Sequence, residues 1–269
     1  MRIAIDAHSV GTQLAGNESY AVNLIEALAQ IDQVNEYTLY LTQQSAVARF
    51  QHRWPNFSVR RTLPHTPIVR IPLTLSAELR RRPVDLLHVQ FTAPPFTPCP
   101  FVTSIHDLSF EHLPQTFRRR SRLQLRLTVR RSARSAAHVL VPSEFVRRDI
   151  LQTYELPPER VSTIPLAAAE GFRPVTEASE IDRIRQTYDI PDRYILSVGS
   201  IQPRKNLAQL IAAYSLLRRE RSGDKLPRLV LVGKAAWLYG ETLRKIAASG
   251  IENSIVVTGY VPDNDLPAL

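Results

Sequence analysis

His106 is the residue whose type and position most favour chemistry. It comes at the end of an apolar run, where a strand over residues 101–107 is expected to end. Ligands of open parallel sheets bind beyond the carboxyl ends of the strands, and an imidazole there can hydrogen-bond a hydroxyl group or transfer a proton. The alternative is a core histidine satisfied by the backbone. Zinc binding is disfavoured, because His88, His106 and His112 lack the spacing of a ligand set.

A glycine-containing turn follows the first expected strand. Gly16 comes directly before an amphipathic helix expected over residues 17–30. Glycine at this place lets the backbone approach a phosphate, and the helix N-terminus supplies unpaired amides. The spacing of Gly11 and Gly16 matches the first half of a P-loop. However, Asn17-Glu18 replaces the required Lys-Ser/Thr, which disfavours a nucleoside triphosphatase. The plainer alternative is that Gly16 only permits a tight turn.

A third stretch places two cations after a strand-end glycine. Gly199 is followed by Arg204 and Lys205, at the start of an expected helix. Arginine offers a planar fork and lysine a point charge, and the helix amides add to both, so this arrangement suits a pyrophosphate group. An Arg-Lys pair alone is ordinary solvated surface. Its position after the first strand of a second strand–helix series favours a binding role.

The net charge of +9 is concentrated in one segment, residues 118–134, which has eight arginines and no acid. The rest of the chain carries mixed signs. Arg118, Arg119, Arg122 and Arg126 lie in an expected basic amphipathic helix, which predicts contact with an anionic membrane or with nucleic-acid phosphates. No aromatic residues interleave these arginines, which disfavours binding of single-stranded nucleic acid. The alternative is the solvated face of a helix that packs on the core.

The elements that support these residues follow a regular pattern. Strand-like and helix-like stretches alternate along the chain, which predicts an α/β protein. The first series has expected strands over residues 2–8, 37–42, 57–62, 85–91, 101–107, 138–142 and 160–166, and helices over 17–30, in the arginine segment and over 143–154. The second has expected strands over residues 193–200, 228–234 and 254–260, and helices over 177–188, 206–219 and 241–249. Two doubly wound domains are predicted, residues 1–173 and 174–269. Apolar runs at 194–198 and 229–232 predict strands covered on both faces.

Composition excludes several classes of protein. The chain has 269 residues, of which 44% are hydrophobic and 22% charged, as in ordinary globular proteins, which rules out disorder and fibrous repeats. The single cysteine, Cys99, excludes an internal disulfide and a multi-cysteine zinc site, which fits a reducing compartment. Asp6 interrupts the N-terminus too early for a secretory signal, and no long apolar run occurs. A cytoplasmic protein is therefore predicted, with peripheral contact at the inner membrane through the arginine segment.

Several stretches, taken in order, resemble the retaining glycosyltransferases of family 4, and most closely the bacterial mannosyltransferase-like members that build surface polysaccharides. Individually these motifs are short, but the ordered set is specific and covers nearly the whole chain. The matching stretches are IAIDA (3–7), AGNESY (15–20), TSIHDL (103–108), VPSEF (141–145), SVG (197–199), PRKNL (203–207), LVGK (231–234) and TGYV (258–261). The resemblance implies the GT-B fold of two facing Rossmann-like domains.

The resemblance also implies a reaction. A hexosyl group, mannosyl in the mannosyltransferase-like members, would move with retained configuration from a nucleotide diphosphate sugar to a saccharide or lipid-linked acceptor, without a metal or another cofactor. His106 would be the active-site histidine and would contact the transferred sugar. Gly16 would lie near the donor phosphates and the acceptor. Gly199, Arg204 and Lys205 would hold the donor diphosphate. Arg118, Arg119, Arg122 and Arg126 would lie on the acceptor side or the membrane side.

Two departures from the family pattern bear on activity. Ser200 stands where some members carry a further arginine, so neutralisation of the phosphates leans on Arg204 and Lys205. Family members also continue into a segment with two glutamates, which contacts the ribose and the sugar. The expectation is therefore a truncated chain whose second domain is incomplete, with little or no activity alone and with self-association through exposed apolar surface.

Two other readings of the sequence compete with the transferase. The first is a non-catalytic basic α/β module that binds nucleic acid or anionic membrane through residues 118–134. The transferase reading, by contrast, expects no specific nucleic acid. The second is a sugar-nucleotide epimerase or dehydrogenase, which the missing GxGxxG fingerprint disfavours.

Overall fold

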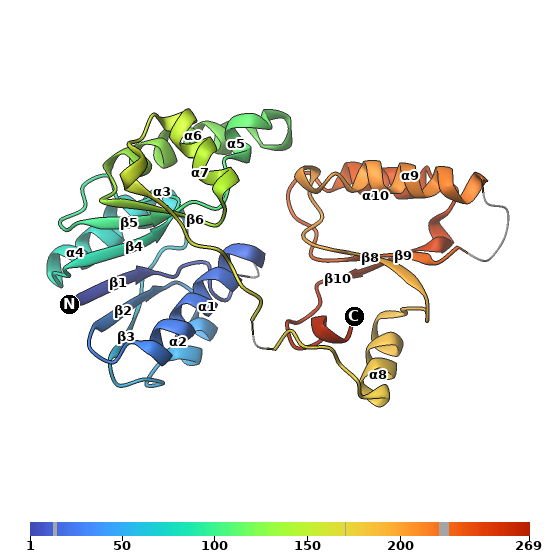
Figure 1. Ribbon diagram of the computed structural model, residues 1–269, viewed down its shortest axis with the longest axis horizontal. Coiled ribbons are helices and arrows are strands. Elements are labelled where there is room, and N and C mark those ends of the chain that lie inside the picture. Colours follow the sequence, from blue (N-terminus) through green and yellow to red (C-terminus); the bar gives the residue numbers. More distant parts are fainter. Residues whose placement is uncertain (13–14, 170, 221–225) are drawn as a thin grey trace. The chain divides into compact units, whose positions relative to one another are not determined.

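The chain folds into two compact units, Met1–Ala167 (unit 1) and Ala168–Leu269 (unit 2). The computed structural model describes residues 1–12, 15–169, 171–220 and 226–269 (Figure 1). The boundary predicted after Arg173 falls in the segment that leads into the first helix of unit 2. Each unit is built on its own parallel sheet, as the alternation of strand-like and helix-like stretches predicts.

The sheet of unit 1 has seven parallel strands in the order β3-β2-β1-β4-β5-β6-β7. The strand order reverses between β1 and β4, and in such sheets the crevice at the reversal is the usual binding place. The strands are β1 (Arg2–Asp6), β2 (Glu36–Leu41), β3 (Phe57–Arg61), β4 (Leu86–Gln90), β5 (Phe101–Ser104), β6 (His138–Val141) and β7 (Val161–Thr163). All seven were expected from the sequence, and the observed strands are shorter at most ends.

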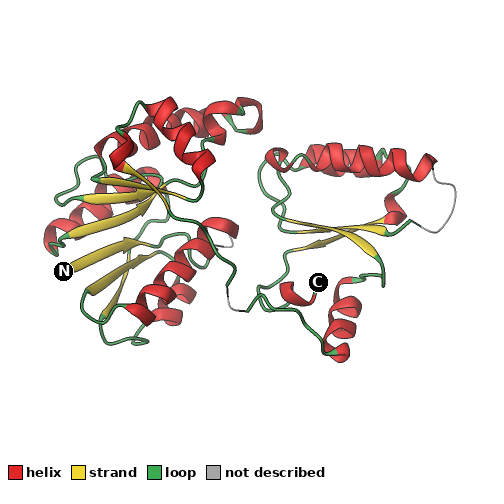
Figure 2. Ribbon diagram, viewed as in Figure 1, coloured by secondary structure: helices red, strands yellow, loops and turns green. Residues whose placement is uncertain are grey.

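Helices cover both faces of the unit 1 sheet (Figures 1 and 2). Helices α1 and α2 pack against one face, and α4, α6 and α7 pack against the other, so each face has its own hydrophobic cluster. The helices are α1 (Ala15–Ile31), α2 (Gln44–Phe50), α3 (Pro67–Val69), the π-helical turn η1 (Arg70–Leu75), α4 (Ser76–Arg81), α5 (Ser109–His112), η2 (Pro114–Thr116), α6 (Arg119–Ser135), α7 (Glu144–Tyr154) and η3 (Pro158–Arg160).

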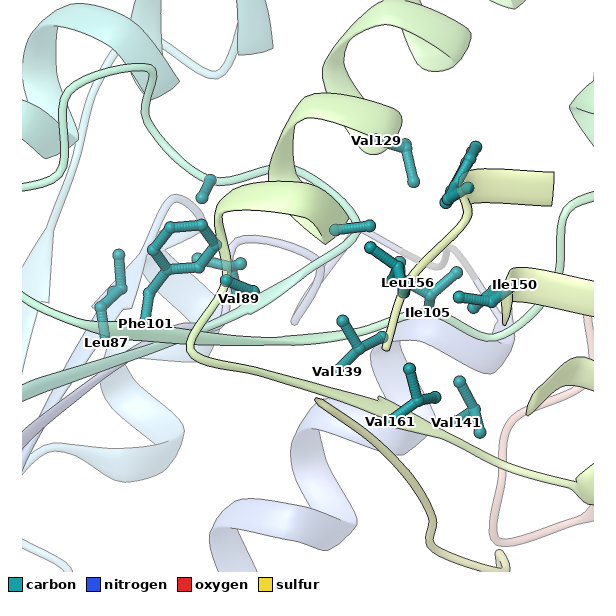
Figure 3. Close-up of a cluster of buried hydrophobic side chains, with 14 of the residues drawn as sticks. Leu87, Val89, Phe101, Ile105, Val129, Val139, Val141, Ile150, Leu156 and Val161 are labelled. Carbon is teal, nitrogen blue, oxygen red and sulfur yellow. The ribbon is translucent and has the colours of Figure 1, made fainter. Parts of the chain in front are cut away.

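The larger cluster shows how α6 and α7 are held (Figure 3). Val129 of α6 and Ile150 of α7 are fully buried against strand residues such as Val89 and Val139. Each fully buried side chain of this size contributes roughly 1.5–3 kcal/mol. The predicted apolar face of the arginine helix is therefore a core face. The predicted cap of α7 is also confirmed, because the Ser143 hydroxyl accepts a hydrogen bond from an amide of the first turn.

Unit 2 has three parallel strands in the order β10-β9-β8. Helices α9 and α10 lie on one face and α8 on the other (Figure 1). The elements are α8 (Ala178–Tyr188), β8 (Tyr194–Val198), η4 (Pro203–Lys205), α9 (Leu207–Glu220), β9 (Arg228–Val232), α10 (Gly240–Ala247), η5 (Glu252–Ser254), β10 (Ile255–Gly259) and η6 (Leu266–Ala268).

The prediction that both apolar strands of unit 2 are covered on both faces is wrong for one of them. Strand β9 is central, and its residues 229–232 are fully buried. Strand β8 lies at the edge of the sheet, and Val198 is 56% exposed. An apolar run is typical of a strand that is covered on both faces, but the sequence of the run does not show which elements cover it. In the described part of unit 2, β8 has one neighbouring strand.

Candidate active site

His106 lies just beyond β5, at the carboxyl edge of the unit 1 sheet. Its ring is half-buried, and its Nε2 lies 3.2 Å from Oε1 of Gln90, at the end of β4. Tyr20 and Phe91 meet the ring nearly edge-on, with centroid distances of 4.6 and 5.5 Å. Burial lowers the pKa of His106, against a smaller opposing effect of Asp107. The ring is therefore neutral at neutral pH and is firmly oriented.

Gly16 lies in the first turn of α1, directly before Asn17, which contacts the Gln90 partner of His106. It is exposed, and a Cβ atom there would meet nothing within 4 Å. The carbonyl of the next residue, Asn17, accepts a hydrogen bond of 3.1 Å from Nε2 of Gln90, which links the start of α1 to His106. The tight turn belongs instead to Gly11, with φ of 80°. Residues 13–14 of the predicted turn lie outside the described residues.

A second layer of polar side chains lies beneath His106. The hydroxyl of Ser104, on β5, is 2.8 Å from Nε2 of His88 and 2.7 Å from the hydroxyl of Tyr20. Burial lowers the pKa of His88 to about 4, and the neighbouring His106 adds to this effect. His88 is consequently a neutral, buried ring. It matches the core-histidine alternative that the sequence left open for His106.

Asp6 and Arg70 form a buried ion pair at the end of β1. Arg70 donates to both carboxylate oxygens of Asp6, at 2.8 and 3.1 Å, and both side chains are almost completely inaccessible. Burial alone would raise the pKa of the Asp6 carboxyl, but His8 and Arg70 together outweigh it and hold that pKa well below its usual range. The pair therefore stays ionised, and it fixes η1 against the carboxyl end of β1.

The space next to His106 is small and mixed in character. A cavity of about 10 Å³ is lined by polar groups on one side and apolar side chains on the other: Tyr20, Ser104, His106, Leu140, Val141, Pro142, Ile164 and Leu166. Within unit 1, larger clefts lie away from His106. One of about 590 Å³ is lined by Val59, Glu78 and four arginines, Arg60, Arg61, Arg81 and Arg82. Strand β3 and the end of α4 thus bring two distant arginine pairs together beside Glu78, so this surface has mixed signs, as the sequence indicates outside residues 118–134.

In unit 2, the structure brings Gly199, Arg204 and Lys205 into one loop between β8 and α9. Arg204 and Lys205 form the short turn η4, and Asn206 then adopts a left-handed conformation, φ 52°, directly before α9 begins. A Cβ atom on Gly199 would lie 3.6 Å from Cε of Lys205, so the strand end and the lysine are neighbours. The cationic pair thus precedes the N-terminal amides of a 14-residue helix, an arrangement suited to an anion.

Gly233, after β9, supports this loop, although the sequence reading gave it no role. Its φ of 145° is unfavourable for other residues, and a Cβ atom there would lie 2.1 Å from the carbonyl oxygen of Gly199. The two strand ends therefore pack backbone against backbone. Gln202, in the same loop, is buried, and within the described part of the chain its Oε1 has no hydrogen-bond partner.

The arginine helix α6 divides its cations between two roles. Arg122 donates to the carbonyl of Phe110 at 3.0 Å, and Arg126 forms a 2.6 Å ion pair with Glu111, so both are engaged within unit 1. Arg118 and Arg119 are exposed, and in residues 1–12, 15–169, 171–220 and 226–269 no ion pair or side-chain hydrogen bond involves them. Two of the four predicted acceptor-side or membrane-side arginines thus present their charge to solvent.

The described residues contain no group of three or more His, Cys, Asp or Glu side chains arranged to hold a metal ion. Across the same residues, no helix is both long enough and apolar enough to pass through a membrane.

Sequence reasoning missed Gln90, Tyr20 and Arg70 as contributors to the site. Gln90 carried a usable signal, a polar residue at the carboxyl end of an otherwise apolar strand. Tyr20 belongs to a matched family motif, but its partner Ser104 is distant in sequence. No motif or periodic pattern distinguishes Arg70 from the other arginines of the sequence, so it could not be predicted.

Each unit has its own parallel sheet of the Rossmann type, which is the arrangement of the GT-B fold. Solved structures agree with this fold. Anabaena Alr3699/HepE, crystallised with UDP-glucose, matches with a TM-score of 0.66 at 18% identity, over 100% of this chain and 71% of that one. WaaG, a glycosyltransferase involved in lipopolysaccharide biosynthesis, matches with a TM-score of 0.67 at 15% identity, over 100% and 72%.

The chain belongs to glycosyltransferase family 4. The model described as Glycosyltransferase Family 4 matches residues 15–168, and the one described as Glycosyl transferases group 1 matches residues 180–269. The O-antigen chain mannosyltransferase B of Escherichia coli is 31% identical over 169 residues, which are 62% of this chain and 44% of that protein. The chain thus spans less than half of this relative's length. The predicted family and fold are confirmed.

Proposed function

We propose that the protein transfers a hexosyl group, with mannose as the first candidate, from a nucleotide diphosphate sugar to a saccharide or lipid-linked acceptor. The family membership supports glycosyl transfer, and the 31% identical relative, a mannosyltransferase by name, supports mannose. The observation that carries the proposal is the loop of Arg204 and Lys205 before α9. Two cations next to the N-terminus of a helix suit a diphosphate leaving group.

Each residue has a defined task in the proposed reaction. The bond from the sugar C1 to the diphosphate oxygen breaks, and an acceptor hydroxyl forms the new bond to C1 and gives its proton to the departing phosphate. Arg204, Lys205 and the α9 amides stabilise the negative charge that develops on the diphosphate. His106 hydrogen-bonds the transferred sugar, and the first turn of α1 at Gly16 lies near the donor phosphates and the acceptor. The anomeric configuration is retained.

Residues of α6 favour a peripheral contact with an anionic membrane, which would present a lipid-linked acceptor. Leu123 and Leu127, one turn apart, are 58% and 65% exposed. Arg119, Arg120 and Arg130 are exposed on the same helix, and the helix has no acid. Exposed leucines flanked by arginines suit the boundary between anionic headgroups and acyl chains. The similarities to known proteins give no support to the nucleic-acid alternative.

The proposed reaction is tested by incubating the chain with GDP-mannose or UDP-glucose and a mannose-terminated oligosaccharide. Mass spectrometry then detects the elongated product, and NMR of its anomeric proton reports the configuration. The proposal predicts weak mannosylation with retention, lost when Arg204→Ala and Lys205→Ala are combined. The pair Arg244→Ala and Lys245→Ala, an exposed Arg-Lys pair on α10, is the control. Transfer that survives the first pair, or inverted products, would contradict the assigned roles.

A further inference from the structure

The side chain of Gln90 has only one orientation that satisfies its surroundings. It is buried at the end of β4, and its Nε2 lies 3.1 Å from the carbonyl oxygen of Asn17. A carbonyl oxygen only accepts hydrogen bonds, so the amide nitrogen of Gln90 must face it. The hydroxyl of Ser9 also donates to that carbonyl, and it is therefore left to accept the second N–H of Gln90, at 3.5 Å. Reversing the amide would place two acceptors against each other.

This orientation decides which nitrogen of His106 carries the proton. Oε1 of Gln90, which only accepts, lies 3.2 Å from Nε2 of His106, so Nε2 is the donor. A neutral imidazole has one N–H group, and Nδ1 therefore holds a lone pair. In the part of the chain that the structure describes, no hydrogen bond uses this Nδ1. His106 thus offers an acceptor to whatever binds beside it.

Neighbouring aromatic side chains restrict the rotation of the His106 ring. Tyr20 and Phe91 contact it edge-on, and the hydroxyl of Tyr20 is tied to Ser104 at 2.7 Å. Phe91 is itself held in a left-handed conformation, φ 61°, by a 3.0 Å hydrogen bond from its amide to the carbonyl of Ser104. An aromatic residue adopts this conformation only where its surroundings impose it.

We propose that Gln90 is a positioning residue that fixes His106 in its Nε2-protonated form, so that Nδ1 accepts a hydrogen bond from a neutral hydroxyl group of the ligand. A hydroxyl has a proton to give, whereas a phosphate or carboxylate oxygen would bring lone pairs against a lone pair and leave both unsatisfied. The site therefore selects a neutral saccharide over an acidic one at this position. That the hydroxyl belongs to the transferred sugar rests on the proposed function.

The tautomer is measured directly by ¹⁵N NMR of the full chain labelled at histidine, with the His106 signals assigned by their loss in His106→Gln. In the wild type, Nδ1 should show the shift of an unprotonated nitrogen, and the proton on Nε2 should be protected from exchange with water. In Gln90→Leu, that protection should be lost. In Gln90→Glu, the Nε2 proton should stay, and the pKa of His106 should rise by roughly one unit or more, because a carboxylate at this distance stabilises the imidazolium.

The control is Gln43→Leu, the same substitution at a glutamine whose Nε2 is 3.5 Å from a ring nitrogen of His65, on the surface. It should leave every His106 signal unchanged. A proton on Nδ1 in the wild type would overturn both parts of the proposal, because the site would then present a donor suited to anionic oxygen. An unchanged pKa of His106 in Gln90→Glu would overturn the role of Gln90. These NMR measurements contain neither the nucleotide sugar nor the saccharide acceptor. Their outcomes can therefore be interpreted even if the proposed transfer reaction fails.

Discussion

At the scale of single residues, the buried ion pair of Asp6 and Arg70 stabilises the carboxyl end of β1. Two charges that are almost fully excluded from water are tolerated only because each satisfies the other. Removing one partner leaves the second charge buried and uncompensated, which costs far more than removing an exposed pair.

Arg70→Met should therefore lower the free energy of unfolding of unit 1 by about 3–5 kcal/mol. Arg2→Met, which breaks an ion pair with Asp85 that is about half exposed, should change it far less, because water screens that pair. Urea unfolding followed by tryptophan fluorescence measures both changes in free energy. The Trp237→Phe background leaves Trp54, in unit 1, as the only tryptophan. Equal stability of the two variants would show that the buried pair is dispensable. Adding Asp6→Asn to Arg70→Met should restore much of the loss.

The buried ring of His88 predicts a pH dependence of stability. Its pKa is lowered to about 4 in the folded state, whereas an unfolded histidine titrates near 6.5. Between these values the unfolded chain binds a proton that the folded chain does not, so the free energy of unfolding falls as pH falls from 6.5 towards 4. The full stabilisation is present above pH 6.5, and the loss is at most roughly 3 kcal/mol.

Urea unfolding at pH 7 and pH 5 measures this effect in the same Trp237→Phe background. His88→Gln should reduce the difference between the two pH values. His138→Gln, at a half-buried ring that also contacts a serine at 2.8 Å, should preserve it. An undiminished difference in His88→Gln would assign the dependence to other groups.

Residue-scale prediction from the sequence succeeded where the signal is local. His106 was placed at the carboxyl edge of a parallel sheet because it adjoins the end of a recognisable strand, and Gly16 because it ends the turn between the first strand and the first helix. Arg70 was not placed, because its partner Asp6 is 64 positions away and no periodic pattern connects them. The orientation of Gln90 also depends on a carbonyl of another element, which no sequence pattern reports.

At the scale of elements, the contact between the ends of β8 and β9 predicts the effect of one methyl group. Gly233→Ala would bring a Cβ atom within 2.1 Å of the Gly199 carbonyl in a backbone conformation that disfavours side chains. It should destabilise unit 2 by more than about 2 kcal/mol. Gly240→Ala, where a Cβ atom meets nothing, is the control. Thermal unfolding followed by Trp237 in a Trp54→Phe background measures both, and equal melting temperatures would refute the close approach.

Helix α6 predicts selective binding to anionic vesicles. Leu123→Ser removes one exposed leucine from the proposed membrane face and should lower partitioning into phosphatidylglycerol-containing vesicles about tenfold, since burying a leucine is worth roughly 1.5–3 kcal/mol. Leu216→Ser, on α9, changes a leucine that is equally exposed, at 58%, and should have no effect. Cosedimentation measures the bound fraction. Binding to neutral phosphatidylcholine alone, or equal losses in both variants, would contradict a membrane face on α6.

Most elements could be predicted because buried parallel strands and amphipathic helices have distinct periods. Helices α2 and α4 were missed because they have only seven and six residues, too few to display a helical period clearly. The covering of β8 was mispredicted for a different reason. Its apolar residues are those of a strand covered on both faces, and its actual neighbours are a matter of tertiary structure.

At the scale of the whole molecule, the apolar side chains of β8 predict self-association. Ile195, Leu196 and Val198 are all exposed at the edge of the unit 2 sheet. A contiguous apolar edge favours pairing with another copy. The apparent mass in analytical ultracentrifugation should rise with concentration, and Val198→Lys should reduce this rise. A monomer at all concentrations would contradict the prediction.

The central claim of the proposed function is that Arg204 and Lys205, in the loop before α9, bind the diphosphate of a nucleotide sugar. Calorimetric titration of GDP and of GDP-mannose tests it most directly. The combined Arg204→Ala, Lys205→Ala change should weaken the binding of both ligands at least tenfold, and Arg244→Ala, Lys245→Ala should weaken neither. Undiminished binding without Arg204 and Lys205, or an equal loss in the control pair, would contradict the account.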